Sequence, residues 1–527
     1  MRLREPVTPL TAARAVLAAR KVPGWLVGGA VRDALLGRPL NDVDIVVPGD
    51  AVGLARAVAR ASGGAFVPLA PDRGIARVVW PRGQGTAEGD VAFGVGVDGI
   101  AADAILDLTD FVGGTLASDL AARDFTINAL AVPLEEAHVG DAPGAVVDRS
   151  DFRARTIDLA GGLADLDAQI VRMVSPAALD ADPIRLLRGP RIAAELGFTL
   201  EDGTAAAIAT RAGLLDRPAR ERVRDELMRL LAVDDAAGWI ARLESLGLLA
   251  VVLPEVAACR GVGAPGADVL DHSLSVLDVA CRMTRRVAAA AAHDRTGTAP
   301  SDLPSEIDNL LADRPDAFAA HFGRRIGGRP WAVWWRLAAL LHDIGKPAAA
   351  VWDDAAGRWR FRGHDEIGAE LAQALVQRLR LGQDESRRIV AVVRHHLRPL
   401  ALADAPLSRR ATYRFFQATG DAGVDTALHA LADRAAKREP GHADLAGVVG
   451  TVAALLRAWY DAPDVAVAPR PLLTGNDVMA EFDVPPGPRI GALLAGLREA
   501  QAAGEVRTIT EARAWIARAA ESETDPG

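Results

Sequence analysis

The strongest constraint on the fold comes from one string near the start of the chain, where two glycines and then two aspartates follow a short apolar run. The string reads GGAVRDALLG over residues 28–37 and NDVDI over residues 41–45. This pattern predicts a strand over 25–27, a helix that begins at the glycines and is capped at Gly37, and a second strand over 43–47. A glycine turn that leads into a helix lets backbone N–H groups approach a phosphate.

Asp42 and Asp44 lie two residues apart on the second predicted strand. Because a strand alternates its faces, both carboxylates share one face, and the apolar residues beside them share the other. Two neighbouring carboxylates suit Mg²⁺, which binds one or two of them together with substrate phosphates. We therefore expect a Mg²⁺-dependent transfer site on phosphates, to which Gly28, Gly29 and Arg32 also contribute.

Composition limits the class of protein. The chain has 527 residues, of which 50% are hydrophobic and 24% charged, and this excludes disorder over most of its length. The net charge of −9 means that any contact with nucleic acid must be local. Two cysteines exclude a disulfide scaffold and a cysteine-rich zinc site. With no apolar run long enough for a membrane span and no visible signal peptide, we expect a cytoplasmic protein without a membrane partner.

The first string and four later segments resemble, in order, the class II nucleotidyltransferases, the family of bacterial CCA-adding tRNA nucleotidyltransferases and poly(A) polymerases. RDFTINAL (123–130) is similar to the motif that contacts ribose and triphosphate, and DLAGGLADL (158–166) to the motif that joins head and neck. DPIRLLR (182–188) is similar to the base-reading motif, and RERVRDE (220–226) to the helix after it. The resemblance implies that the nucleotide contacts Arg123, Asp124, Asn128, Asp182, Arg185 and Arg188.

In that family the base-reading Asp and Arg face the Watson–Crick edge of C or A. Both bases carry an exocyclic amine that an Asp accepts from and a ring nitrogen to which an Arg donates. Asp182 and Arg185 are three residues apart, so on a helix they would face one way. Gly189-Pro190 predicts an interruption of the helix that follows. Asp107, in the string LDLT, is our candidate for a third catalytic carboxylate, and an edge-strand acid is the alternative.

A second group of motifs begins with LLHDIGKP at 340–347, where His342 and Asp343 end an apolar stretch. Imidazole and carboxylate ligands suit a divalent metal that activates water at a phosphate. The string resembles the HD phosphohydrolase superfamily, and the resemblance implies ligands at His272, His342, Asp343 and Asp433 for a transition metal or Mg²⁺. It also implies that His364 and one of His395 and His396 extend the site. His429 is a candidate neighbour of these ligands, and His138, His293, His321 and His442 are expected to be structural.

These observations predict a multidomain α+β protein. A small mixed-sheet nucleotidyltransferase head (1–155) precedes an all-helical neck (156–258), an HD helical domain (259–445) with a mobile insert near 294–317, and a helical tail (446–527). The predicted reaction adds C, A or both to the tRNA 3′ end from CTP and ATP and releases pyrophosphate. The tRNA acceptor arm would be held by Arg220, Arg222, Arg394 and Arg398.

Two other functions stay open. The first is a restricted A-adding, CC-adding or poly(A)-adding enzyme with the same chemistry. The second is an HD phosphohydrolase whose head has become a nucleotide-binding module. The intact Asp42, Asp44, Arg123 and Asp124 argue against the second.

Overall fold

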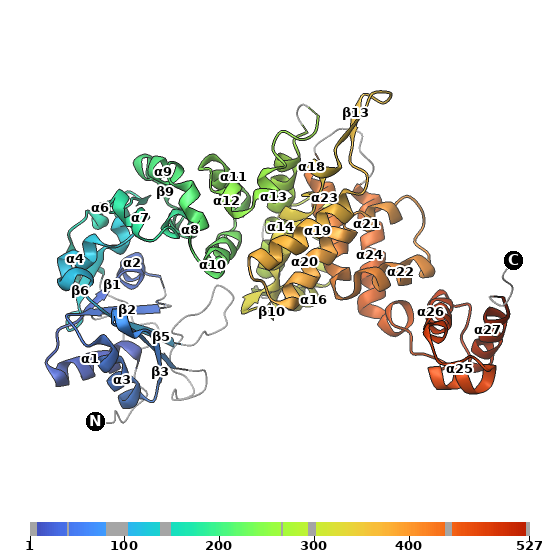
Figure 1. The fold of residues 1–527 in the computed structure, drawn as a ribbon, viewed down its shortest axis with the longest axis horizontal. Helices are drawn as coiled ribbons and strands as arrows, with labels where there is room; N and C mark the ends of the chain where they lie inside the picture. Colours follow the sequence, from blue (N-terminus) through green and yellow to red (C-terminus); the bar gives the residue numbers. More distant parts are fainter. Residues whose placement is uncertain are drawn as a thin grey trace. The chain divides into compact units, whose positions relative to one another are not determined.

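The computed structural model describes residues 8–38, 40, 42–80, 104–137, 149–264, 267–292, 302–437 and 445–522 (Figure 1). The chain divides into two compact units, one of residues 1–219 with 245–248 and one of residues 220–244 with 249–527. His138, His293 and His442 lie outside the described residues, as does the side chain of Asp42. Among the described residues, no helix has the length and apolar character needed to cross a membrane.

The first unit is built on a seven-stranded sheet in the order β3-β4-β5-β2-β1-β6-β7. Only β2 and β5 pair in parallel among these described strands, so the sheet is mixed, as predicted. The strands at 25–27 and 43–47 are confirmed, and Gly37 caps the predicted helix with φ +68°. The strands are β1 (Trp25–Val27), β2 (Asp42–Val47), β3 (Ala65–Ala70), β4 (Ile75–Trp80), β5 (Ala104–Asp110), β6 (Leu130–Pro133) and β7 (Ile157–Asp158).

Helices cover this sheet and continue beyond it. α1 and α3 contact each other, and α3 also packs on β4 and β5. The helices of this unit are α1 (Pro9–Arg20), α2 (Gly29–Leu36), α3 (Ala51–Ser62), α4 (Leu116–Ala121), α5 (Arg149–Ala154), α6 (Gly162–Asp167), α7 (Pro176–Ala181), α8 (Arg185–Leu196) and α9 (Asp202–Ala209), with a short 3₁₀ turn η3 (Thr126–Asn128). A further two-stranded sheet pairs β8 (Ile170–Val171) with β9 (Thr199–Leu200).

The interruption predicted at Gly189-Pro190 is wrong, because α8 runs through both residues. Gly189 lies against the ring of Phe125, where a Cβ atom would come within 2.9 Å of the ring carbon Cζ. Pro190 removes one helical hydrogen bond but is itself buried in this packing. Packing at this face of α8 therefore outweighs the tendency of Gly189 and Pro190 to interrupt a helix.

The second unit is mostly helical (Figure 1). Long helices α14, α17, α20 and α23 pack against one another at its centre. Its helices are α10 (Arg220–Leu231), α11 (Ala236–Ser245), α12 (Leu249–Val252), α13 (Pro254–Ala257), α14 (Val269–Ala292), α15 (Ser305–Asp313), α16 (Pro315–Gly323), α17 (Trp331–Leu341), α18 (Lys346–Ala349), α19 (His364–Arg378), α20 (Gln383–His395), α21 (Arg398–Leu402), α22 (Arg409–Thr419), α23 (Gly423–Ala436), α24 (Leu445–Asp461), α25 (Gly475–Phe482), α26 (Pro488–Ala503) and α27 (Ile509–Ser522).

The mobile insert predicted near 294–317 is wrong over its second half. Residues 293–301 lie outside the described chain, but α15 begins at Ser305 and α16 follows it. Ile307 and Leu311, four residues apart, are both buried. Two buried apolar residues on one face are enough to hold a short helix against its neighbours, although the predicted insert as a whole is polar.

Two short hairpins interrupt the helices of this unit. β10 (Arg325–Ile326) pairs with β11 (Arg329–Pro330), and β12 (Val351–Asp353) pairs with β13 (Arg358–Arg360). The last three helices have a small core of their own, which includes Leu473, Val478, Leu497 and Ile516.

Candidate functional site

Two carboxylates lie side by side on the central parallel strands of the first unit. β2 and β5 pair so that Asp44 is directly opposite Asp107. Residues paired in this way share a face of the sheet. Val43 and Ile45 are buried on the other face, as the alternation predicted, whereas Asp44 is half-buried. The backbone of Asp42 begins β2 opposite Ile105, so the described part of the predicted carboxylate pair is Asp44.

Arg77 occupies both oxygens of Asp107 in this structure. Its Nε donates to Oδ1 at 2.8 Å and its Nη2 to Oδ2 at 2.9 Å. The partner comes from β4, where Arg77 is paired in register with Asp107. The sequence analysis missed Arg77, because nothing local links it to an acid thirty positions later; the link is the strand register. Asp107 is therefore an ion-paired carboxylate, and Arg77 uses one acceptor site on each of its oxygens.

Gly28 lies between a cation and a carboxylate at the end of β1. It has φ +72°, and a Cβ atom there would be 2.9 Å from Arg123 Nη1 and 3.5 Å from Asp44 Oδ2. A side chain would therefore fill the space between these two groups. Arg123 is itself held by Asp119, which accepts from Nε at 3.2 Å and Nη2 at 3.1 Å. The sequence analysis missed Asp119, although its i,i+4 spacing from Arg123 is a usable signal.

Four predicted nucleotide-binding side chains form one continuous polar chain. Arg32 Nη1 donates to Asn128 Oδ1 at 2.7 Å, and Asn128 Nδ2 donates to Asp124 Oδ1 at 3.1 Å. On the other side, Arg188 Nη1 donates to Asp124 Oδ2 at 3.2 Å. This chain joins α2, η3 and α8. Burial by itself would raise the pKa of Asp124, but Arg188 and the Asn128 amide outweigh it and lower that pKa.

The prediction that Asp182 and Arg185 share a helix is wrong. α7 ends before Asp182 and α8 begins at Arg185, and the residues between form a turn. Pro183 explains the break, because it disfavours helical geometry in the residue before it, and Asp182 is extended with φ −141° and ψ 91°. The two charges still interact: burial lowers the pKa of Arg185, while Asp182 and Asp124 act to raise it.

The Arg185 guanidinium is directed at backbone. Its Nη1 donates to the carbonyls of Ala122 at 2.9 Å and Ala178 at 3.0 Å. Its Nε is buried and has no hydrogen-bond partner among the described residues. Both of these bonds come from Nη1, so the other donors of the guanidinium are not used by these carbonyls.

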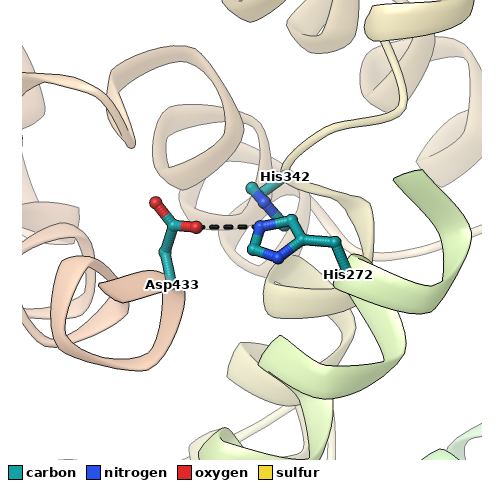
Figure 2. A group of neighbouring side chains, drawn as sticks. All are labelled: His272, His342 and Asp433. Atoms are coloured by element: carbon teal, nitrogen blue, oxygen red, sulfur yellow. Dashed lines mark hydrogen bonds and ion pairs between the residues drawn. The ribbon is translucent and has the colours of Figure 1, made fainter. Parts of the chain in front are cut away.

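In the second unit, the predicted HD-type residues converge from five helices or helix ends. Two groups have ligand atoms that all lie within 4.8 Å of one another: His272, His342 and Asp433, and Asp343, His364 and His396. Figure 2 shows the first group, in which His272 Nε2 lies 2.9 Å from Asp433 Oδ1. The two groups meet at the adjacent pair, where His342 Nε2 is 3.0 Å from Asp343 Oδ2.

The ring orientations of three histidines suit a metal. His342, His364 and His396 each place Nδ1 at 2.6–2.9 Å from the carbonyl three residues earlier. A carbonyl only accepts, so each Nδ1 carries a proton, and in the neutral form of each ring Nε2 keeps its lone pair. His364 Nε2 and His396 Nε2 face each other at 3.2 Å. Two lone pairs cannot satisfy each other, and a shared cation would satisfy both, so these residues fit a divalent metal.

Electrostatics favour the ligand forms of His396 and Asp343, whereas Asp343 outweighs burial and raises the pKa of His342, which favours its protonated ring. Burial, assisted by the charge of His342, lowers the pKa of His396 to about 4, which keeps that ring neutral. Burial would raise the pKa of Asp343, but His342 and Lys346, whose Nζ is 2.6 Å from Asp343 Oδ2, hold it well below its usual value. His429 is fully buried 4.9 Å from the His342 ring, and neither of its nitrogens has a hydrogen-bond partner within the described chain.

The remaining predicted residues lie around this cluster or apart from it. His395 accepts from Arg398 Nε at 3.1 Å and belongs to neither ligand group, whereas the adjacent His396 does. Arg394 forms an ion pair with Glu366. Arg220 and Arg222 are in the first turn of α10. His321 is structural, as expected, because its Nε2 lies 2.6 Å from the buried Asp425.

Family models match the chain in three places. A model described as the poly(A) polymerase head domain matches residues 24–172, one described as the probable RNA- and SrmB-binding site of polymerase A matches residues 197–260, and an HD domain model matches residues 317–422. The two outer ligands, His272 and Asp433, lie outside the HD match, and the fold brings them to it.

Curated relatives span nearly the whole chain. An A-adding tRNA nucleotidyltransferase of Deinococcus radiodurans is 36% identical over 94% of this chain and 95% of the relative. A CC-adding tRNA nucleotidyltransferase of Thermus thermophilus is 33% identical over 93% of this chain and 92% of the relative.

The fold is similar to that of solved CCA-adding enzymes. The Bacillus stearothermophilus CCA-adding enzyme in complex with CTP has a TM-score of 0.56 and 23% identity over 99% of both chains. A CCA-adding enzyme in complex with ATP has a TM-score of 0.58 and 18% identity over 97% of this chain and 94% of that one.

The ion pair of Arg188 with buried Asp124 generates a stability prediction. Arg188→Met should lower the free energy of unfolding of the first unit by about 2 kcal/mol at pH 7, because it leaves a buried carboxylate without its cation. The pair stabilises the protein above the ordinary Asp pKa of 3.8, and this contribution is lost as the pH falls below it. The deficit of the variant in urea unfolding should therefore persist down to about pH 4 and shrink only below it.

Arg211→Met is the matched control. Arg211 pairs with Asp180, whose side chain is 50% exposed, so its loss should cost less than about 1 kcal/mol and show no such pH dependence. Equal effects of the two substitutions at every pH would show that the Asp124 pair is not buried in solution.

Proposed function

The chain belongs to the tRNA nucleotidyltransferase family whose catalytic part is the poly(A) polymerase head domain, and we propose that it extends tRNA 3′ ends with C, A or both, using CTP and ATP in the cytoplasm. The observation that carries this proposal is the Gly28 turn, where a Cβ atom would meet both Asp44 and Arg123. A carboxylate suited to metal and a guanidinium suited to phosphate thus both lie next to a backbone position that has no side chain of its own. The relatives include A-adding and CC-adding enzymes, so both restricted reactions remain alternatives.

In the proposed reaction the 3′-hydroxyl of the RNA attacks the α-phosphorus of the nucleotide. The new ester bond forms as the bond to the β-phosphate oxygen breaks, and pyrophosphate leaves. Mg²⁺ bound at Asp42 and Asp44 would neutralise charge on the reacting oxygens. Asp119 orients Arg123 towards the triphosphate, and Asn128 with Asp33 orients Arg32 at the start of α2. Both arginines are thus fixed before substrate binds, which favours positioning as the main contribution of the protein.

We propose that Asp182 and Arg185 read the base edge. The support is their position next to the polar chain that ends at Arg188, together with the electrostatic interaction between them. Arg185 Nη1 donates to two backbone carbonyls, which fixes the position of the guanidinium. Its remaining N–H groups would donate to a ring nitrogen of the base.

Asp44→Asn tests the chemistry. The amide keeps the shape of the side chain but removes the charge that holds metal, so incorporation of CMP or AMP into a tRNA without its CCA end should fall by at least about a hundredfold. Asp72→Asn, at an exposed acid of the same unit, is the control and should behave like wild type. Near-native rates for Asp44→Asn with Mg²⁺ would overturn the assignment.

Arg185→Ala tests base reading. Values of kcat/KM for CTP, ATP, UTP and GTP on one tRNA should show the CTP-to-UTP ratio falling about 10- to 100-fold, because a bidentate edge contact provides discrimination of that size. Arg211→Ala serves as the control for loss of a cation from the same unit. If all four nucleotides slow by a common factor, Arg185 supports the fold or general binding, and its base-reading role must be withdrawn.

We also propose that the HD-type cluster is a divalent metal centre that hydrolyses phosphoesters, separate from nucleotide addition. It is supported by three inward-facing Nε2 lone pairs and two buried carboxylates in two adjoining groups. When bound, the metal would supply an activated water. Lys346, beside Asp343, is the cation placed to contact the phosphate.

The adjacent residues His395 and His396 test this proposal, with His396 as the residue changed and His395 as its control. His396→Ala should weaken Mn²⁺ binding about tenfold or more, measured by metal analysis after dialysis, and should abolish hydrolysis of p-nitrophenyl phosphate. His395→Ala should change neither, since its ring lies outside both groups. Addition of CMP and AMP should persist in both variants. Equal metal loss in the two variants, or none in either, would contradict the ligand assignment.

A further inference from the structure

The β12–β13 hairpin lies within the HD-type sequence but has no part in the metal ligand set. It is inserted between the ligand pair His342-Asp343 and the ligand His364. Figure 1 shows the hairpin, at the label β13, extending away from the helices of its unit. Side chains on the hairpin are therefore exposed to solvent, while both ends of the hairpin lead to proposed metal ligands.

Two tryptophans form a cross-strand pair on this hairpin. Trp352 is directly opposite Trp359, and their rings are 5.4 Å apart in a T-shaped arrangement. Both indoles are exposed, at 47% and 37%. An aromatic pair stabilises a short hairpin, but the two rings leave much of their surface in water. Two large aromatic faces left in water indicate a surface on which planar groups stack.

The charges around the pair are mixed. Arg358 and Arg362 are exposed and form no ion pair with any described residue, whereas the carboxylate of Asp353 is engaged by Arg360. A groove of about 510 Å³ lies against the hairpin, and its lining includes Trp352, Arg360 and Arg362 together with Asp353 and Asp354. Guanidinium groups beside aromatic faces are the combination that single-stranded nucleic acids bind: phosphates meet the cations and bases meet the rings.

The base of the hairpin is fixed to the metal cluster. Lys346 Nζ, which lies 2.6 Å from Asp343, is also 5.5 Å from the centre of the Phe361 ring. The carbonyl of Phe361 in turn accepts from His364 Nδ1 at 2.7 Å. Trp359 is five residues before His364, so the extended chain limits their Cα separation to at most about 17 Å. A few nucleotides of single-stranded RNA would bridge that distance.

We propose that the β12–β13 hairpin is a stacking platform for single-stranded RNA, which makes phosphoesters of such RNA the substrate class of the HD-type centre. Bases stack on Trp352 and Trp359, the backbone contacts Arg362, which lines the same groove as Trp352, and the next phosphate reaches the metal cluster. Hydrolysis there adds water to phosphorus and breaks the P–O bond to ribose, whose oxygen takes the proton. The assignment of RNA phosphoesters as the substrate rests on the proposed hydrolase activity. The assignment of the hairpin as a binding platform for single-stranded RNA does not.

The test compares full-length variants that keep the hairpin but differ in aromatic surface. Trp352→Ile with Trp359→Val retains a good strand pair without π-faces, and Trp352→Phe with Trp359→Phe retains both. Binding of a fluorescein-labelled single-stranded hexaribonucleotide is measured by anisotropy in EDTA, which prevents turnover. The Ile/Val variant should bind at least about tenfold more weakly than wild type, and the Phe/Phe variant within about threefold. Binding of a blunt RNA duplex should be unchanged in both.

A further variant isolates the charges. Arg362→Gln should reduce the dependence of log Kd on log salt concentration by about 0.7, the value for one phosphate contact on a single strand, whereas Arg358→Gln, on the opposite face of β13 from Trp359, should leave it unchanged. Hexamer binding by the Ile/Val variant equal to wild type, or an equal loss for single strand and duplex, would overturn the platform. All these variants should hydrolyse p-nitrophenyl phosphate at wild-type rates with Mn²⁺. If the wild-type protein hydrolyses neither this probe nor RNA, the proposed hydrolase activity and its RNA substrate are both refuted. The difference in hexamer binding between the Ile/Val and Phe/Phe variants would still show whether the hairpin binds single-stranded RNA.

Discussion

The first unit depends on the buried carboxylate of Asp124. It accepts from the amide of Asn128 and from the guanidinium of Arg188, and through Asn128 it holds Arg32. These contacts connect the helix after the glycine turn, the short turn η3 and the helix α8 that follows the base-reading segment. A carboxylate at 7% exposure is tolerated only because its charge is compensated on both oxygens. Removing Asn128 or Arg188 would therefore disturb the proposed phosphate-binding and base-reading elements together.

The two proposed centres use different chemistry because their ligands differ. The head offers carboxylates on a strand face next to guanidinium groups, which suits a hard, oxygen-seeking ion and a triphosphate. The HD-type cluster offers imidazole lone pairs fixed by backbone carbonyls, which suits a borderline metal and activated water. The described residues of each set lie inside a single unit.

The sequence predicted the features that are local. The glycine turn, the cap at Gly37 and the alternation on β2 follow from short-range rules, and the structure confirms them. The predictions that failed are those in which a longer-range contact decides. Pro183 separates Asp182 from Arg185, and packing on Phe125 keeps α8 continuous through Pro190. Arg77 reaches Asp107 only through strand register. Likewise, the choice between His395 and His396 depends on how the end of α20 is oriented, which a two-residue motif does not encode.

The central claim is that this chain builds the tRNA 3′ end itself. The most direct measurement offers the wild-type protein three tRNAs, ending before CCA, after the first C and after CC, each with CTP, ATP or both, and sequences the products. The account predicts discrete addition of C, A or both to at least one of these ends, with one pyrophosphate released per nucleotide and no use of UTP or GTP. It would be contradicted by the absence of extension on all three tRNAs, or by equal incorporation of all four nucleotides.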